Sequence, residues 1–240
     1  MTAVQDKDQF WVTLDDPLTK NAVDQPMIAA LAAAIETAPA GVLVLTGKNG
    51  GFSTGGKLAT LVELSEQAKT DTASVAELIR RGGNLIEDLL FSSSTTVALI
   101  DGACAGAGLG IALACDYRIA THRSRFTTAY GKLGLPSDFG THELLRRRIG
   151  VDEADELMKT SELIGITKAS ELGLIDAVTE RTDRKGVKKA LKSVPERTRK
   201  RRMADISAVL DAEALEFAKV LTLPEIELKL EKALRKAARK

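Results

Sequence analysis

The sequence predicts an α/β fold followed by a helical C-terminal part. Short apolar stretches typical of buried strands alternate with helical patterns through the first half of the chain, and residues beyond 141 are mostly helical in pattern. No linker rich in proline or serine separates the two parts. We therefore expect one α/β core over residues 1–190 and a helical region over residues 191–240.

The elements of the first half follow from hydrophobic periodicity. Alternation over Phe10–Asp16 predicts a strand, and a helix follows with Asp24 as its N-cap, two residues before Pro26. Apolar runs bounded by glycine predict buried strands at 41–47 and 95–102.

The remaining elements follow in the same way. Residues 72–90 predict a helix with one buried face, formed by Val75, Leu78, Ile79, Leu85, Ile86, Leu89 and Leu90. We expect strands at 117–121 and 173–178, and a polar surface flap at 65–72. Residues 223–240 predict an amphipathic helix, with Ile226, Leu230, Leu234 and Ala237 on one stripe.

Composition excludes several classes of protein. The 240 residues are 44% hydrophobic and 28% charged, and the net charge of +1 gives no reason to expect a nucleic-acid or membrane partner. Cys104 and Cys115 lack zinc-type spacing, so we expect reduced thiols and no metal. The apolar runs are too short to span a bilayer and the first residues lack a signal-peptide pattern, so we expect a cytoplasmic protein.

The only strong charge bias lies in the basic stretch 181–205. A solvated helix face accounts for such a stretch, and so does a surface for a polyanion, either the phosphates of a nucleotide or RNA bound by Arg197–Arg202. Both interpretations stay open.

Two glycine-rich loops each follow a predicted strand. The first, at 51–57, fits a phosphate-binding P-loop, but Leu58 stands where a magnesium-binding hydroxyl is required. The second, at 106–110, has Ile111 where a dinucleotide loop needs its third glycine. Either the glycines permit close packing, or both loops present backbone N–H groups to one carbonyl oxygen as an oxyanion hole.

Four segments carry a resemblance to a known family. They are "VTLDDPLTKNAVDQPMIAAL" (12–31), "GFSTGGKLATL" (51–61), the stretch from "VALIDGACAGAG" to "LLRRRIG" (97–150) and "TSELIGITKASELGLIDAV" (160–178). Together they resemble the crotonase (enoyl-CoA hydratase/isomerase) superfamily, and the central stretch matches its signature without a gap.

The resemblance implies a crotonase-like spiral of ββα units with a C-terminal helical trimerisation region. It also implies an acyl-CoA thioester as substrate, no further cofactor, and a homotrimer or a hexamer. The amides of Gly56 and Ala107 correspond to the oxyanion-hole donors. Residues expected near coenzyme A are Lys20, Ala22, Ser53, Thr54 and Lys57, the last standing where the family motif has aspartate.

The carboxylates favour isomerisation over hydration. Hydratases of this family use two glutamates, whose positions correspond to Gly110 and Tyr130 in this chain. Asp138 instead resembles the loop aspartate of acyl-CoA isomerases, which implies an enoyl-CoA isomerase with Asp138 as proton shuttle. Tyr130 then orients the substrate or donates a hydrogen bond, and His142 is placed to tune Asp138.

Other interpretations of these residues remain. Asp138 precedes a predicted helix and is a good candidate for its N-cap. The whole protein can equally be a non-catalytic acyl-CoA-binding homologue, a decarboxylase or lyase acting through the same enolate, or an RNA-binding homologue.

Overall fold

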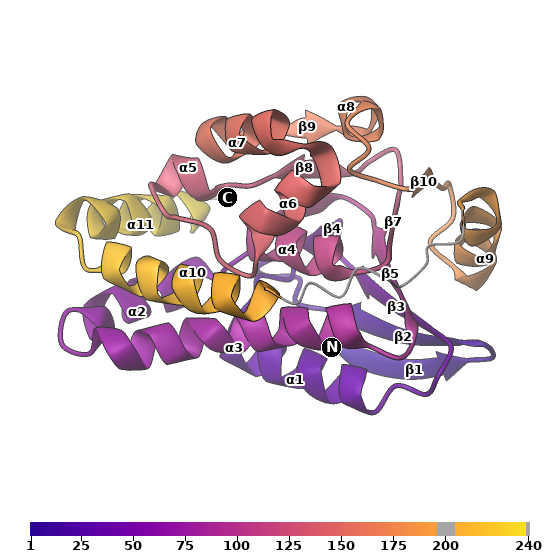
Figure 1. Ribbon diagram of the computed structural model, residues 1–240, viewed down its shortest axis with the longest axis horizontal. Helices are drawn as coiled ribbons and strands as arrows, with labels where there is room; N and C mark the ends of the chain where they lie inside the picture. The colour runs from indigo at the N-terminus through magenta and orange to yellow at the C-terminus, as the bar shows by residue number, and fades with distance from the viewer. Residues whose placement is uncertain (196–204, 239–240) are drawn as a thin grey trace.

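The computed structural model describes residues 1–195 and 205–238 and contains two β-sheets (Figure 1). The six-stranded sheet has the order β1 (Thr2–Asp6), β2 (Gln9–Leu14), β3 (Val42–Gly47), β5 (Thr95–Ile100), β7 (Tyr117–Ala120) and β10 (Ala177–Val178). The four-stranded sheet has the order β4 (Gly51–Ser53), β6 (Ala103–Ala105), β8 (Arg125–Thr127) and β9 (Ile164–Gly165). Pairing is antiparallel only between β1 and β2 and between β8 and β9.

Successive units of two strands and a helix connect the sheets. In each unit a strand of the first sheet leads into a short strand of the second and then into a helix: α2 (Leu58–Ala68), α4 (Ala107–Ala114) or α5 (Tyr130–Leu133). The connection from β5 to β6 requires glycine at position 102. Gly102 has φ +95°, and an added Cβ would lie 2.0 Å from the Gly50 carbonyl oxygen. The predicted spiral of ββα units is confirmed.

Helices cover both faces of the six-stranded sheet. Leu43 and Leu45 of β3 pack in the cluster that contains residues of α1 (Gln25–Glu36) and α3 (Thr72–Phe91), whereas Val44 packs against α9 (Arg184–Ser193) on the other face. This arrangement explains the unbroken apolar runs of β3 and β5, since a strand buried on both faces needs no polar alternation.

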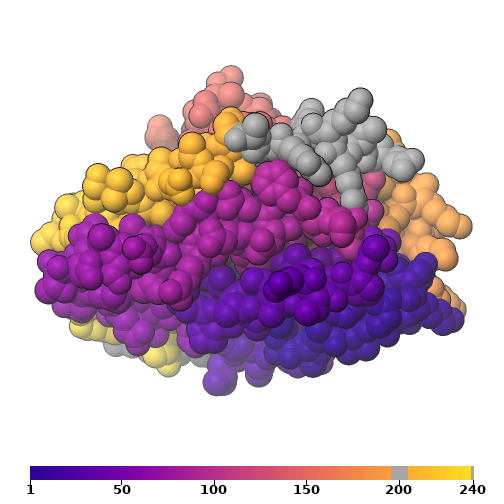
Figure 2. All heavy atoms as spheres, turned by 60° about the horizontal axis from the view of Figure 1, so that its bottom comes forward, coloured from indigo at the N-terminus to yellow at the C-terminus, as the bar shows by residue number. Residues whose placement is uncertain are grey.

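The C-terminal helices lie on the body of the same chain. The helices that follow α5, besides α9, are α6 (Thr141–Ile149), α7 (Val151–Thr160), α8 (Ile166–Glu171), α10 (Ile206–Leu221) and α11 (Pro224–Ala237). Helix α10 runs along α3 and α11 packs against α2 (Figure 1). Figure 2 shows these two helices, orange to yellow, as a band beside the purple and magenta helices α2 and α3. Their role in forming trimers stays a prediction.

Most sequence-predicted elements are confirmed, including the Asp24 cap, whose side chain accepts a hydrogen bond from Met27 N at 3.0 Å. The flap predicted at 65–72 is wrong, because α2 extends to Ala68 and buries Ser65, whose hydroxyl donates to Leu221 O at 2.8 Å. The strand predicted at 173–178 is reduced to the two residues of β10.

Cys104 and Cys115 are both buried and free. Over the described ranges, no helix has the length and apolar character needed to cross a membrane.

Candidate active site

The two glycine-rich loops touch each other at one end of the second sheet. Strand β4 runs parallel to β6, so the segments that follow them leave the sheet on the same side. A Cβ added to Gly55 would lie 2.9 Å from Ala105 O, and one added to Gly106 would lie 3.6 Å from Gly55 Cα. Close packing is therefore one reason for the glycines, as expected.

The amides of Gly56 and Ala107 are free at this contact. Val23 N donates to Gly55 O at 2.7 Å, and Lys57 N donates to Val23 O at 2.9 Å. These two hydrogen bonds join Val23 to the residues on either side of Gly56 and do not use the Gly56 N–H. Ala107 is the first residue of α4, so its N–H has no acceptor within the helix. Among the described residues neither N–H has a hydrogen-bond partner, and the α4 dipole favours negative charge beside Ala107. Their joint action as an oxyanion hole stays a prediction.

A buried asparagine holds the neighbouring loop, and sequence reasoning gave it no role. Asn21 is fully buried with φ +64°, and its Nδ2 donates to Lys48 O at 3.0 Å and to Gly51 O at 2.8 Å. Its Oδ1 accepts from Asp16 N at 2.8 Å. Asparagine tolerates the left-handed region better than most residues, and the only sequence signal was its place in the "KNA" part of the N-terminal segment.

The residues expected near coenzyme A lie around this loop, but several side chains have internal partners. The Ser53 and Thr54 hydroxyls donate to Asn21 O and Thr19 O, both at 2.7 Å. Lys57 Nζ lies 3.0 Å from Asp24 Oδ2. Ala22 is buried and Lys20 is exposed, with φ +53°. Their contacts with coenzyme A stay predictions.

Asp138 and Tyr130 form a buried pair beside these loops. Tyr130 begins α5, and its hydroxyl donates to Asp138 Oδ1 at 2.5 Å and lies 3.1 Å from Thr141 Oγ1. Burial raises the pKa of Asp138 to about 7, with the hydrogen bond from Tyr130 acting against this rise and the charge of Glu213 adding to it. Burial, and then the charge of Asp138, raises the pKa of Tyr130 well above its usual range, so the phenol stays protonated and donates.

Two sequence interpretations around Asp138 are wrong. Helix α6 begins at Thr141 with Gly140 as its N-cap, and the side chain that accepts from its first turn is Ser137, whose Oγ takes the hydrogen bond of His142 N at 3.0 Å, so Asp138 is not the cap. His142 Nε2 contacts Asp155 Oδ1 of α7 at 2.7 Å rather than Asp138, so it does not tune that carboxylate directly.

Gly110 shows why the first family glutamate has no place here. A Cβ on Gly110 would lie 2.5 Å from Thr141 Oγ1 and 2.9 Å from Phe139 O. The segment that carries Asp138 therefore occupies the space into which a side chain at 110 would point. This backbone can therefore hold Asp138 in its present place or a glutamate at position 110, but not both.

Substituting this glycine is expected to destabilise the protein. Gly110→Ala should lower the free energy of unfolding by ~1–3 kcal/mol through overpacking, although alanine is the better helix former. Chemical denaturation measures this, with Gly165→Ala as control, because a Cβ there meets only Arg125 Cζ at 4.0 Å. Wild-type stability of Gly110→Ala would contradict the packing described above.

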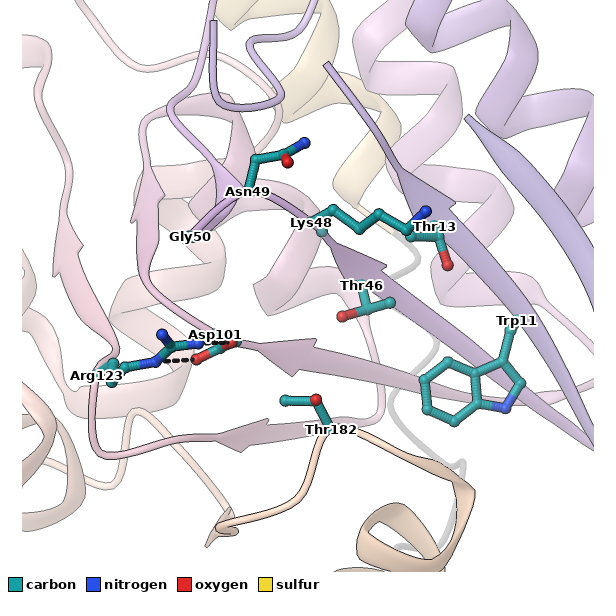
Figure 3. A pocket seen from close by; sticks show the side chains of 10 residues that line it. Trp11, Thr13, Thr46, Lys48, Asn49, Gly50, Asp101, Arg123 and Thr182 are labelled. Atoms are coloured by element: carbon teal, nitrogen blue, oxygen red, sulfur yellow. Dashed lines mark hydrogen bonds and ion pairs between the residues drawn. The ribbon is translucent and has the colours of Figure 1, made fainter. Parts of the chain in front are cut away.

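A separate hollow of about 480 Å³ lies on the α9 face of the six-stranded sheet (Figure 3). Its lining includes Trp11, Thr46 and the ion pair of Asp101 with Arg123. None of its lining residues belongs to the candidate site.

Comparison with known proteins decides the family. A model of the enoyl-CoA hydratase/isomerase family matches residues 9–216. The chain belongs to this family. The contacts of Asp138, Tyr130 and Gly110 are thus those of an enoyl-CoA hydratase/isomerase family member that lacks glutamate at both 110 and 130.

Relatives carry the names of both isomerases and hydratases. The chain is 32% identical over 177 residues to a trans-2-decenoyl-[acyl-carrier-protein] isomerase of Streptococcus mutans, covering 70% of this chain and 65% of that protein. It is 31% identical over 182 residues to an enoyl-CoA isomerase/hydratase of Mycosarcoma maydis, covering 70% and 64%. The matched part thus spans less than two thirds of these relatives.

Solved structures agree over nearly the whole chain. An enoyl-CoA hydratase from Bacillus halodurans superposes with a TM-score of 0.85 at 27% identity, covering 96% of this chain and 98% of that one. One from Mycobacterium avium subsp. paratuberculosis has a TM-score of 0.80 at 24% identity, covering 98% and 95%, and shows the fold alone. The crotonase fold is therefore confirmed.

Proposed function

We propose that this protein is an isomerase of enoyl thioesters that shifts a carbon–carbon double bond through an enolate. The observation that carries the proposal is the buried pair of Asp138 and Tyr130, on a segment whose next residues, Phe139 and Thr141, pack against Gly110. One carboxyl stands beside two positions at which family hydratases use glutamate, and neither position holds one here. A single carboxyl is sufficient for isomerisation, which moves one proton between two carbons.

The proposed reaction starts from a 3-enoyl thioester. The Asp138 carboxylate removes a proton from C2, and the electron pair of that C–H bond is delocalised over C2–C4 and the thioester carbonyl. The negative charge on the carbonyl oxygen is stabilised by the N–H groups of Gly56 and Ala107. Asp138, now a carboxylic acid, returns the proton to C4, and the double bond lies between C2 and C3.

Tyr130 orients the carboxyl in this proposal. Its hydroxyl donates to Asp138 Oδ1, and the other hydrogen bond to the carboxyl comes from the backbone N–H of Asp138 itself, so no second side chain of the described residues holds Oδ2. Oδ2 is then the oxygen that meets the substrate. The raised pKa of Tyr130 keeps its proton on the phenol at neutral pH, so the orienting hydrogen bond persists through the reaction.

The environment of Asp138 suits a group that both takes and returns a proton. A general acid–base catalyst works best with a pKa near the operating pH. Burial raises the pKa of Asp138 to about 7, so both protonation states are accessible near neutrality. An exposed aspartate is almost fully ionised there and is a weaker base.

The thioester carrier is part of the proposal. Lys20, Ala22, Ser53, Thr54 and Lys57 are proposed to lie along the pantetheine and phosphates of coenzyme A, and Lys20, which is exposed, is proposed to bind a phosphate. The relative from Streptococcus mutans is named for an acyl-carrier-protein substrate, so thioesters of that carrier belong in the same test. A homotrimer or a hexamer is the proposed assembly.

Product analysis tests the proposal. The wild-type protein is incubated with 2-enoyl and 3-enoyl thioesters of several chain lengths on both carriers, and products are identified by mass spectrometry and NMR. We expect products of unchanged mass with a shifted double bond. Products heavier by one water would indicate a hydratase, and tight thioester binding without turnover of any substrate would indicate a non-catalytic homologue. The RNA-binding alternative depends on Arg197–Arg202, which lies outside the described residues.

A further inference from the structure

A carboxylate from the C-terminal region reaches the segment that carries Asp138. Glu213 lies on α10 and is partly buried, and its Oε2 accepts a hydrogen bond from Gly140 N at 2.8 Å. We propose that Glu213 is a positioning residue of the site: it holds Gly140, and through it Asp138, in the orientation that proton transfer needs. This inference rests on the proposed function and adds to it a residue from α10.

The backbone next to Asp138 needs such an anchor. Phe139 and Gly140 both lie in the left-handed region, with φ of +54° and +63°. This region is unfavourable for a residue with a Cβ, so Phe139 is held there by its surroundings. Its ring packs on Gly82 of α3, where an added Cβ would lie 2.3 Å from Phe139 Cζ. The hydrogen bond from Gly140 to Glu213 is the second anchor.

Helices α3 and α10 thus contact the segment that carries Asp138, and α4 contacts it as well. Leu210 of α10 approaches Gly140, with Cδ2 3.3 Å from the place of an added Cβ. On the opposite side Thr141 Oγ1 lies against Gly110. Removing the Glu213 carboxylate therefore removes one of the contacts that hold the segment carrying Asp138.

Glu213 also acts on Asp138 through its charge. The groups that influence Glu213 are the N–H of Gly140, the hydroxyl of Ser137, and His142 and Glu143 of α6, while Asp138 and Tyr130 lie on the site side. On α3, Arg80 forms ion pairs with Glu87 and with Asp211 of α10, not with Glu213. No cation thus contacts Glu213 among the described residues, and its negative charge favours the protonated form of Asp138.

The test separates the hydrogen bond from the charge with two variants of the full chain. Glu213→Gln keeps an oxygen that can accept from Gly140 N and removes the charge, whereas Glu213→Ala removes both. Glu216→Gln, on the exposed side of α10, is the matched control. The readouts are kcat and KM across neutral pH, hydrogen exchange of the Gly140 amide, and the NMR titration of 13C-labelled Asp138, assigned with Asp138→Asn.

We expect Glu213→Ala to lose about 10-fold to 100-fold in kcat with little change in KM and to exchange the Gly140 amide faster. Glu213→Gln should keep most of the wild-type kcat and most of the wild-type protection of the Gly140 amide. Both variants should titrate Asp138 at lower pH, and the acidic limb of the pH–rate profile should move with it, because a negative neighbour has been removed.

The proposal is overturned if Glu213→Ala folds and keeps the wild-type kcat, or if Asp138 titrates as in the wild type in both variants. It is also overturned if the Gly140 amide is equally protected in wild type and Glu213→Ala. Absence of turnover in the wild type would refute the proposed function instead, and the exchange and titration measurements would still decide whether Glu213 holds and polarises the Asp138 segment.

Discussion

Asp138→Asn is expected to lower kcat for double-bond migration by about 10²-fold to 10⁴-fold, the usual contribution of a positioned acid–base group. Asparagine has nearly the same shape, and its Oδ1 can still accept the hydrogen bond from Tyr130, so the site should keep its geometry. The amide has no oxygen able to take up a proton at neutral pH. Steady-state kinetics on the best substrate, together with the dissociation constant for a saturated acyl thioester, measure the effect.

Asp155→Asn is the matched control for this loss. Asp155 is an exposed carboxylate whose partners are His142 and Arg146, and it has no contact with the Asp138–Tyr130 pair. It should keep the wild-type kcat, and both variants should bind the saturated thioester as tightly as the wild type does. Equal turnover by wild type and Asp138→Asn would remove Asp138 from the mechanism.

Ala107→Pro is expected to cost about 10²-fold to 10³-fold in kcat, because it deletes one donor of the proposed oxyanion hole. Ala107 is the first residue of α4, a position at which proline fits the helix and at which no backbone hydrogen bond is lost. The N–H is therefore removed with little other change. Kinetics and thermal unfolding of the same preparation separate catalysis from folding.

Ala107→Gly provides the comparison, since it keeps the N–H and changes only the side chain. Its kcat should stay within a few-fold of the wild type. If Ala107→Pro folds and retains wild-type turnover, the Ala107 amide does not stabilise the enolate. The hydrogen-bond donors to the enolate oxygen must then lie elsewhere.

The fold was largely readable from the sequence where segments are long and periodic. The buried strands β3 and β5 and the helix α3 follow from apolar runs and from one buried stripe. The second sheet was not predicted, because strands of two or three residues are too short to show a period. Its position is set instead by tertiary contacts such as the close approach of Gly102 to Gly50.

The site was predictable only in part. Asp138 and the two glycine loops came from local sequence and from the family resemblance, and the structure brings Asp138 together with Tyr130. The contact that closes the space at Gly110 was not visible, because it joins residues of α4 and the segment before α6. Glu213 was missed for the same reason: it lies 73 residues from Gly140 on a helix whose pattern marks only its buried face.

The most direct test of the central claim is the product formed from a 3-enoyl thioester in D₂O by the wild-type protein and by Asp138→Asn. We predict that the wild type forms the 2-enoyl thioester, with no addition of water and with deuterium entering only at C2 or C4. Asp138→Asn should form the same product at least about 10²-fold more slowly. A 3-hydroxyacyl product, or the same rate in both proteins, would show that this protein is not an isomerase that uses Asp138 to move the proton.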